Sequence, residues 1–484
     1  MSPSVSSPAS SAANAINAAS AAAPAAGDTA TLLTVHNPAD GTLVGELAAA
    51  DGRQVTAAVA AARQAAGGWA STDPADRGKA LRSAAAALAA RADEVAALNH
   101  RETGKPLPEA LGGVAAGVAT LEQYAELGPV HRGYSLRGAA LSADYTVIGP
   151  RGVAVLLTPW NDPVAVAAGL IGAALVTGNT VIHKPSERSP HTGALLGDVL
   201  SPFFPSGVFS TVTGAADTGA LLTRTDVDVL AHVGSSTAGA RIARAASLTG
   251  AHVIRENGGN DALLVDAGLD PEWAAGQAAI GAFSNSGQIC TAVERIYVHR
   301  NLAGEFCEAL VREARRRNRE APLAPLVDTR LREGVHAQVR DAVAAGARLA
   351  EGGVVPDGPG AHYPATVLVD CARPMAVFTE ETFGPVAAVQ VVDSFEEGLA
   401  LAAQDKYGLA ATVLTPGIEP ALRAVAALPV GTVKINAVFG GAPGGSAQPR
   451  GESGRGFGYG PELLDEFSLV KVVHVGLPRV RGQL

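Results

Sequence analysis

Residues 145–157 read Tyr-Thr-Val-Ile-Gly-Pro-Arg-Gly-Val-Ala-Val-Leu-Leu, an apolar stretch that is typical of buried β-strands. Three similar stretches follow at 179–183, 207–212 and 227–233, and segments rich in Ala and Leu separate them. Strands that alternate with helices at this spacing indicate a parallel sheet with helices on both faces. We therefore predict a doubly wound α/β domain in this part of the chain.

The second half of the chain repeats this alternation and predicts a second α/β domain with a doubly wound parallel sheet. We place the boundary near residue 256, so that 31–130 and 148–255 form the first domain and 256–445 the second. The predicted strands of the second domain lie near 262–265, 296–298, 366–369, 386–392, 411–414 and 432–435.

The N-terminal part before the first sheet predicts short strands and helices. Apolar residues at 32–36 and 43–47 flank an Asn-Pro-Ala-Asp-Gly turn and predict two short strands. Asp51 caps a predicted helix that ends near Gln64, and a second predicted helix runs from about Pro74 to Asn99.

Composition limits the class of protein. A chain of 484 residues with 17% charged residues and a net charge of −9 disfavours nucleic acid and anionic membrane as main partners. Three cysteines provide no disulfide framework and favour a reducing compartment, so we expect a cytoplasmic protein. Residues 1–30 are rich in Ser and Ala without a basic start, which predicts a disordered tail and no signal peptide. No strongly apolar stretch is long enough for a membrane span.

Cys290 is the strongest candidate for chemistry. It lies in Phe283-Ser-Asn-Ser-Gly-Gln-Ile-Cys-Thr-Ala-Val-Glu-Arg295, a polar and turn-rich segment in which a thiolate can form and meet a carbonyl group. Glu256, in Glu-Asn-Gly-Gly-Asn260, lies near the predicted domain junction and provides a separate carboxylate. Cys307 and Cys371 lie in helix-like and strand-like apolar patterns, so we expect both to be inert core thiols.

Four further segments complete a set of motifs. They are Thr158-Pro-Trp-Asn-Asp-Pro163, Thr177-Gly-Asn-Thr-Val-Ile-His-Lys-Pro-Ser-Glu187, His232-Val-Gly-Ser-Ser-Thr-Ala-Gly239 and Phe378-Thr-Glu-Glu-Thr-Phe-Gly-Pro-Val386. With the segments of Cys290 and Glu256, they resemble the aldehyde dehydrogenase superfamily over nearly the whole chain after the tail. Taken singly, each has a plainer interpretation: Asn161 as a turn residue, Lys-Pro-Ser-Glu as a helix start, and Glu381 as part of an acidic surface turn.

The resemblance implies NAD-dependent oxidation of an aldehyde to a carboxylic acid. Cys290 is then the nucleophile and Asn161 the amide donor to the oxyanion, a kind of donor worth roughly 100- to 1000-fold in rate. After hydride transfer to the nicotinamide, a thioester remains on Cys290, and Glu256 activates the water that hydrolyses it. Relatives that pass the acyl group to coenzyme A generally lack this base, so water is the expected acceptor.

The resemblance also implies a cofactor site and no metal site. The ordinary G-x-G-x-x-G fingerprint is absent, which fits the variant dinucleotide fold of this family. The carboxylate of Glu187 accepts hydrogen bonds from ribose hydroxyls and repels a 2′-phosphate, so NAD is favoured and NADP is the alternative. The implied cofactor-binding residues are Thr158, Pro159, Trp160, Lys184, Ser186, Glu187, Gly234, Ser235, Glu381 and Phe383.

The class of substrate is predicted from positions at which this sequence differs from the motifs of the family. Details of the motifs look most like the branch that acts on lactaldehyde, phosphonoacetaldehyde and succinate semialdehyde. However, residues 282–289 contain no basic side chain that would pair with an anionic aldehyde, so we favour a neutral aliphatic or aromatic aldehyde. Arg450 and Arg455 follow a divergent loop and keep a succinate-semialdehyde-type activity as the alternative.

The sequence also bears on the oligomeric state and on two alternative functions. The resemblance implies a homodimer or homotetramer in which residues 131–147 and 466–484 form a small β arm for oligomerisation. The apolar, β-branched end of the chain at 467–475 suits such an assembly. A non-catalytic cofactor-binding scaffold is one rival. A cysteine hydrolase is another, and it would need a His or Lys beside the thiol.

Overall fold

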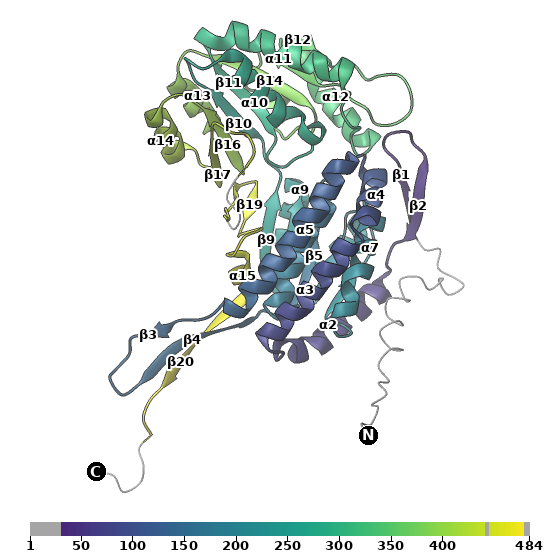
Figure 1. Ribbon diagram of the computed structural model, residues 1–484, viewed down its shortest axis with the longest axis vertical. Helices are drawn as coiled ribbons and strands as arrows, with labels where there is room; N and C mark the ends of the chain where they lie inside the picture. The colour runs from purple at the N-terminus through teal and green to yellow at the C-terminus, as the bar shows by residue number, and fades with distance from the viewer. Residues whose placement is uncertain (1–30, 441–444, 479–484) are drawn as a thin grey trace.

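The molecule consists of two α/β units and a narrow arm. The computed structural model describes residues 31–440 and 445–478. Figure 1 shows the two units stacked along the long axis, with the arm projecting from the lower one. The predicted disordered tail, 1–30, lies outside the described residues, as do 441–444 and 479–484.

The lower unit is built on a six-stranded sheet with the order β19-β9-β8-β5-β6-β7. All neighbours are parallel except β19, which runs antiparallel to β9. The chain enters at β5, proceeds outward through β6 and β7, and then returns to β8 on the other side of β5. Such a switch point places a crevice beyond the carboxyl ends of β5 and β8. The bounds are β5 Val153–Leu157, β6 Thr180–Lys184, β7 Phe209–Thr211, β8 Val229–Gly234, β9 His252–Asn257 and β19 Gly454–Arg455.

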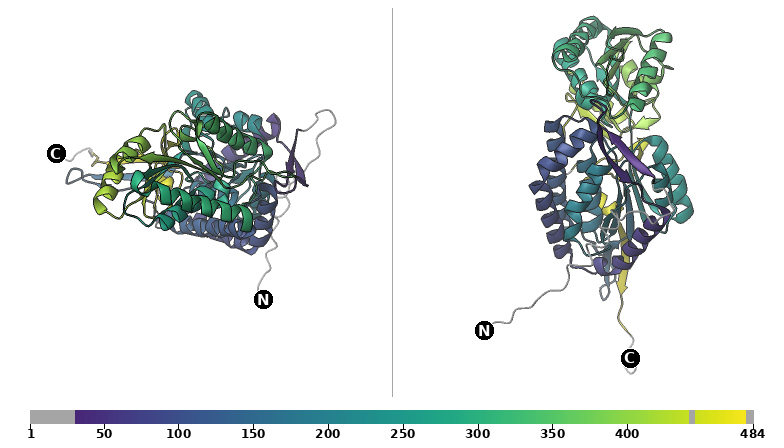
Figure 2. Two further views of the ribbon diagram at one scale, coloured as in Figure 1. Left: turned by 90° about the horizontal axis from the view of Figure 1, so that it is seen from above. Right: turned by 90° about the vertical axis from the view of Figure 1, so that its right-hand side faces the viewer.

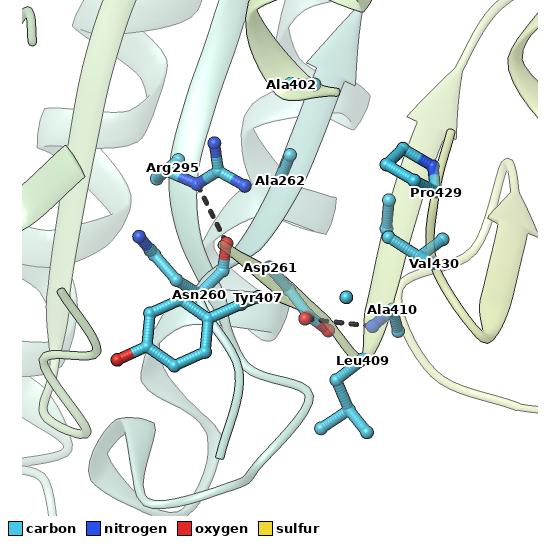
Figure 3. Close-up of a pocket in the computed structure, with 12 residues that line it drawn as sticks. Asn260, Asp261, Ala262, Arg295, Ala402, Tyr407, Leu409, Ala410, Pro429 and Val430 are labelled. Atoms are coloured by element: carbon cyan, nitrogen blue, oxygen red, sulfur yellow. Dashed lines mark hydrogen bonds between the residues drawn. The ribbon is translucent and has the colours of Figure 1, made fainter. Parts of the chain in front are cut away.

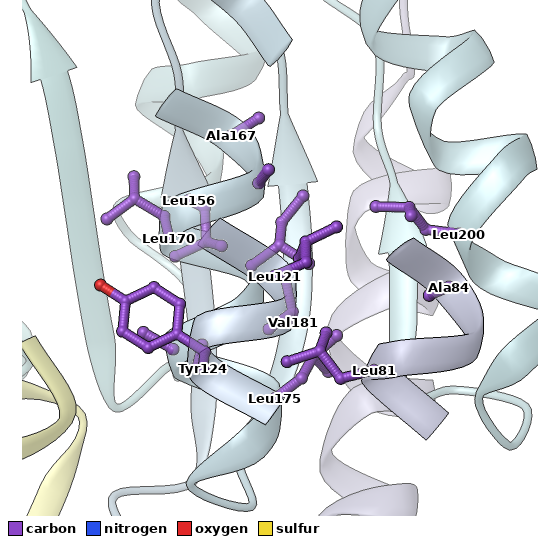
Figure 4. Packing of buried hydrophobic residues seen from close by; sticks show 14 of the residues in the cluster. Leu81, Ala84, Leu121, Tyr124, Leu156, Ala167, Leu170, Leu175, Val181 and Leu200 are labelled. Carbon is purple, nitrogen blue, oxygen red and sulfur yellow. The ribbon is translucent and has the colours of Figure 1, made fainter. Parts of the chain in front are cut away.

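Helices cover both faces of this sheet. One core joins α3, α5, α6 and α7 to the sheet through residues such as Leu121, Tyr124, Leu156 and Val181 (Figure 4). The opposite face packs against α2, α8 and α9. The bounds are α2 Gly52–Ala70, α3 Pro74–Ala90, α4 Ala92–Thr103, α5 Leu107–Leu127, α6 Pro163–Val176, α7 Pro190–Leu200, α8 Ala216–Leu222 and α9 Ser236–Thr249.

The predicted N-terminal helices begin where expected but do not end there. Asp51 caps α2 through a hydrogen bond from the Gln54 amide, and the helix continues to Ala70 instead of ending near Gln64. The single helix predicted from Pro74 to Asn99 is wrong, because the chain leaves helical geometry at Arg91 and starts a new helix, α4. Neither Gly nor Pro marks that break in the sequence.

The upper unit is built on a seven-stranded sheet with the order β12-β13-β14-β11-β10-β16-β17. Only the edge strand β12 is antiparallel to its neighbour. One face packs against α10 and α11 and the other against α12, α13 and α14. The bounds are β10 Asp261–Val265, β11 Val293–His299, β12 Arg348–Glu351, β13 Thr366–Val369, β14 Val386–Val392, β16 Ala410–Leu414, β17 Thr432–Ile435, α10 Pro271–Phe283, α11 Arg300–Glu320, α12 Thr329–Ala344, α13 Phe395–Ala402 and α14 Ile418–Ala427.

The arm is an antiparallel sheet with the order β20-β4-β3, formed by Ser468–Val475, Ala143–Pro150 and Ser135–Leu136 (Figures 1 and 2). Val470 and Val472 in β20 are about two-thirds exposed. The remaining short elements are β1 Leu32–His36, β2 Leu43–Ala48, β15 Tyr407–Gly408, β18 Arg450–Gly451, α15 Leu463–Glu466, and the 3₁₀ turns Gly128–Val130, Ser201–Phe203, Ser284–Gly287 and Ala376–Phe378.

The predicted fold class is confirmed: both large sheets are mainly parallel and are covered on both faces. The division into domains stays a prediction. The C-terminal segment adds β19 to the edge of the first sheet beside β9, a pairing that the sequence did not predict. Among the described residues, no helix combines the length and apolar character needed to cross a bilayer.

Candidate active site

The Cys290 segment follows α10 and is held in an unusual backbone conformation. Asn285 and Ser286 have positive φ angles of 46° and 57°. Hydrogen bonds fix the segment: the Ser286 hydroxyl donates to the Ala324 carbonyl at 2.6 Å, and Gln288 Oε1 accepts from the Val327 amide at 2.9 Å. The loop that presents Cys290 is therefore anchored to the segment before α12.

The Cys290 side chain is partly exposed, and its thiol is free. Burial raises the pKa of this thiol, and the negative charges of Glu256, Asp261 and Glu381 raise it further. Lys434 acts in the opposite direction and lowers it. Cys371 is buried and Cys307 partly buried, and burial raises the pKa of both. Both contact apolar core clusters.

The structure brings Asn161 to the Cys290 segment. Asn161 lies in the loop between β5 and α6, and its Nδ2 donates a hydrogen bond to the Gln288 carbonyl oxygen at 3.2 Å. Gln288 precedes Cys290 by only two residues. A side-chain amide from the first unit thus lies beside the thiol-bearing loop of the second.

Glu256 lies near the end of β9, opposite Val233 of β8 and Gly454 of β19. Burial raises the pKa of its carboxyl group to about 7. A methyl group added at Gly458 would overlap the Glu256 carboxylate, so the C-terminal segment closes around it. This carboxyl group therefore titrates in the range where a general base works near neutral pH.

The cofactor residues predicted after β5 and β6 lie together at the carboxyl edge of the first sheet. Thr158 Oγ1 is 2.8 Å from Nε2 of the buried His183. Lys184 Nζ donates to the Pro185 carbonyl at 3.0 Å and lies 3.9 Å from the Glu187 carboxylate. Burial lowers the pKa of Lys184, and the opposite charge of Glu187 raises it. Ser186 Oγ accepts from the amide of the second residue along the chain at 3.2 Å.

Gly234 and Ser235 join the end of β8 to α9. The Ser235 side chain caps α9 by accepting from the Ala238 amide, so the positive end of a 14-residue helix faces this edge. The hydroxyl of Ser236 is buried without a hydrogen-bond partner among the described residues. Amide groups at a helix start, an unpaired hydroxyl and a nearby lysine suit the pyrophosphate and ribose of a dinucleotide.

Glu381 and Phe383 reach the same junction from the loop before β14. Glu381 Oε1 accepts from the Gly259 amide at 3.1 Å, and burial raises the pKa of this carboxyl group to about 7. The Phe383 ring packs edge-on against Trp160, with centroids 5.6 Å apart and planes at 80°. Residues predicted from two distant motifs are thus in direct contact.

Sequence reasoning missed Glu294, which holds this loop. Its buried carboxylate accepts from the amides of Thr382 at 2.7 Å and Phe383 at 2.9 Å. Burial and the charge of Glu381 raise its pKa well above the ordinary value. A charged residue inside the apolar strand β11 was the available signal.

Asp261 and Arg295 were also missed. Figure 3 shows both among the residues that line a small cavity. Asp261 Oδ1 accepts from the Ala410 amide at 3.0 Å, and burial raises the Asp261 pKa to about 7. Arg295 Nε donates to the Asn260 carbonyl at 2.8 Å and pairs with the buried Asp405 at 2.7 Å. These contacts fix the strand end that follows Glu256.

The sequence model of the aldehyde dehydrogenase family matches residues 25–473. The chain belongs to this family. Betaine aldehyde dehydrogenase of Cereibacter sphaeroides is 34% identical over 469 residues, covering 93% of this chain and 95% of the relative. Betaine aldehyde dehydrogenase of Agrobacterium fabrum is 33% identical over 469 residues, covering 92% of each chain.

Solved structures of aldehyde dehydrogenases superimpose closely on this chain. Betaine aldehyde dehydrogenase from Staphylococcus aureus in complex with NAD+ has a TM-score of 0.89 at 26% identity and covers 94% of each chain. An NAD-dependent aldehyde dehydrogenase from Sinorhizobium meliloti has a TM-score of 0.89 at 29% identity, covering 94% of this chain and 93% of the relative. This protein is therefore an NAD-dependent aldehyde dehydrogenase. The expected branch within the family stays a prediction.

Proposed function

We propose that this aldehyde dehydrogenase oxidises a neutral aliphatic or aromatic aldehyde to the free carboxylate, with Cys290 as nucleophile, Asn161 as oxyanion donor and Glu256 as base. The observation that carries the proposal is the meeting of Asn161 with the Cys290 loop across the two units. Glu256 supports it, because its charge acts on the Cys290 thiol.

The first step is attack of Cys290 Sγ on the carbonyl carbon, which forms a C–S bond and puts negative charge on the carbonyl oxygen. Asn161 Nδ2 is the donor for this oxygen, since its bond to Gln288 is long enough to be exchanged for a stronger one. NAD, held by residues such as Trp160 and Lys184, would supply the acceptor for the hydride from this carbon, which would leave a thioester on Cys290.

The second step is hydrolysis of the thioester. Glu256 takes a proton from water as the water oxygen attacks the acyl carbon, and the C–S bond breaks to return the Cys290 thiolate. A base with a pKa near 7 is largely ionised at slightly alkaline pH and still accepts a proton readily. Transfer to coenzyme A would not need this carboxylate, so we propose water as the acceptor.

The cofactor site supports NAD more than NADP. Glu187 is exposed in the loop that follows β6, so its carboxylate is free to accept from ribose hydroxyls and to repel a 2′-phosphate. The remaining parts of the dinucleotide would be held by Trp160, Lys184, Ser235, Glu381 and Phe383.

The charge of the substrate is inferred from the basic residues of the C-terminal segment. Arg450 and Arg455, which kept an anionic semialdehyde as the alternative, are both exposed. This favours a neutral aldehyde. Betaine aldehyde is a second candidate, because the relatives at 33–34% identity carry that name. A kinetic screen of benzaldehyde, hexanal, lactaldehyde, succinate semialdehyde and betaine aldehyde distinguishes these candidates.

The mechanism is tested with Cys290→Ser and Glu256→Gln. We expect Cys290→Ser to form no NADH with any aldehyde. Glu256→Gln should give a burst of one NADH per active site, followed by turnover slowed roughly 100-fold. Equal steady-state rates of wild type and Glu256→Gln at saturating aldehyde would contradict the role of Glu256. A complete lack of NADH formation by the wild type would favour the scaffold alternative.

The arm bears on how copies of the chain assemble. The exposed apolar face of β20 supports a homodimer or homotetramer, in which a second copy covers it. Light scattering of the full chain measures the number of subunits. The cytoplasmic location stays a prediction from the cysteine content.

A further inference from the structure

The side chain of Glu466 joins two parts of the structure around Glu256. Glu466 is the last residue of α15, which lies between β19 and the arm (Figure 1). Its Oε1 accepts a hydrogen bond from the Phe457 amide at 3.0 Å, and its Oε2 accepts one from His252 Nε2 at 2.6 Å. The Glu466 side chain is only 15% exposed, so both hydrogen bonds are largely shielded from water.

Both partners of Glu466 belong to elements that surround the proposed base. His252 is the first residue of β9, the strand that also carries Glu256 near its end. Phe457 immediately precedes Gly458, which lies so close to the Glu256 carboxylate that an added methyl group would overlap it. The Glu466 carboxylate therefore connects the start of β9 with the loop that packs against the end of that strand.

The loop between β19 and α15 is held on both sides of Gly458. Before it, Gly456 has a left-handed φ of 84°, and a methyl group there would lie 3.0 Å from Glu466 Oε1, so the turn fits closely against the carboxylate. After it, the Tyr124 hydroxyl of α5 donates a hydrogen bond to the Gly460 carbonyl at 3.0 Å. The position of Gly458 thus depends on hydrogen bonds to its two neighbouring stretches of backbone.

Glu466 is itself fixed at the base of the arm. Arg151, which lies between β4 of the arm and β5 of the first sheet, donates from Nε to the Glu466 carbonyl at 2.6 Å. Burial raises the pKa of the Glu466 side chain, but the hydrogen bonds from His252 and the Phe457 amide outweigh burial and hold it below the ordinary value. At neutral pH the side chain is therefore a carboxylate, which accepts hydrogen bonds at both oxygens.

We propose that Glu466 is a positioning residue, which holds the Phe457-Gly458 loop and thereby fixes the place of the Glu256 carboxylate. It acts through this loop and not on the reacting atoms. A general base must lie within hydrogen-bond reach of the water that it activates, and a misplacement of about 1 Å can cost roughly 100-fold in rate. The inference rests on the proposed function, because it takes Glu256 as the base for hydrolysis.

The test compares three variants of the full chain. Glu466→Ala removes both side-chain hydrogen bonds, whereas Glu466→Gln keeps an oxygen that accepts from the Phe457 amide. Asp465→Ala is the matched control, because Asp465 is the neighbouring residue of α15, is exposed and pairs with His131 instead of the loop. Stopped-flow absorbance with saturating NAD and an aldehyde that the wild type oxidises separates the first NADH formed per active site from the steady state.

We expect Glu466→Ala to keep the wild-type rate for the first NADH and to lose about tenfold in the steady state, because a displaced base slows only hydrolysis. Glu466→Gln and Asp465→Ala should follow the wild type. A merely structural role would slow both phases together, and that result overturns the inference, as does an unchanged steady state. If Glu466→Ala does not fold, His252→Ala replaces it, with an expected loss of roughly threefold in the steady state alone and the same contradicting outcomes.

Hydrogen exchange separates this inference from the proposed function, because it requires neither aldehyde nor cofactor. Mass spectrometry of peptides that contain the Phe457 amide should show exchange at least about fivefold faster in Glu466→Ala than in the wild type, Glu466→Gln and Asp465→Ala. Faster exchange in a protein that oxidises no aldehyde would keep the role of Glu466 in holding the loop and remove the proposed reaction. Unchanged exchange and turnover of Glu466→Ala in an active enzyme would remove the role of Glu466 alone.

Discussion

The carboxylate of Glu256 lies directly against Gly458, so that a methyl group added at Gly458 would overlap it. The two residues belong to segments about 200 positions apart, which β9 and β19 bring together. Glycine at 458 leaves the space that the Glu256 carboxylate occupies, so the position of the proposed base depends on the C-terminal segment.

Gly458→Ala should displace Glu256 and slow thioester hydrolysis. We expect a normal burst of NADH and a steady-state rate at least about tenfold lower, because one general base contributes 10²–10⁴-fold. Stopped-flow absorbance at the NADH wavelength separates the two phases. Gly112→Ala, on an open face of α5, is the control and should leave both unchanged. An unchanged steady-state rate in Gly458→Ala would show that Gly458 does not control the position of Glu256.

The raised pKa of Glu256 predicts the pH dependence of hydrolysis. The carboxyl group is protonated below about pH 7 and ionised above it, so the base form is gained as the pH rises. Under conditions where hydrolysis limits turnover, the rate should fall about tenfold per unit below that pKa and level off above it. Rates measured from pH 5.5 to 9 test this. A profile that breaks near the ordinary glutamate pKa would show that burial does not act on this group as described.

Much of the fold was predictable because buried parallel strands appear in sequence as continuous apolar stretches. The β6 segment has this pattern, and the structure places it close to the predicted position. The stretch predicted as a strand at 145–157 is divided, because its first part belongs to β4 of the arm and only its second part forms β5. The break at Arg91 was not predictable, since the residues around it favour helix and only tertiary packing turns the chain. The pairing of β19 with β9 was hidden because β19 has only two residues and its partner is far away in sequence.

The site residues that belong to a sequence motif were predictable, and those that come from distant strands were not. Cys290, Glu256 and Asn161 belong to recognisable segments. Glu294 is a charged residue next to Arg295 in an otherwise apolar strand, and sequence alone cannot distinguish it from a solvent-facing position. Its role depends on which segment packs against that strand, and only the strand order decides this.

Arg188 connects the cofactor loop with the upper unit. Its guanidinium lies 5.2 Å from the centre of the Trp160 ring and pairs with Asp328, the capping residue of α12, at 2.7 Å. Arg188→Met should loosen Trp160 and raise the dissociation constant of NAD by roughly five- to thirtyfold, because a desolvated cation–π contact is worth about 1–2 kcal/mol. Fluorescence titration with NAD measures this. Arg91→Met, which loses an exposed pair with Glu94, is the control. Equal affinities in wild type and Arg188→Met would show that the contact does not position the cofactor.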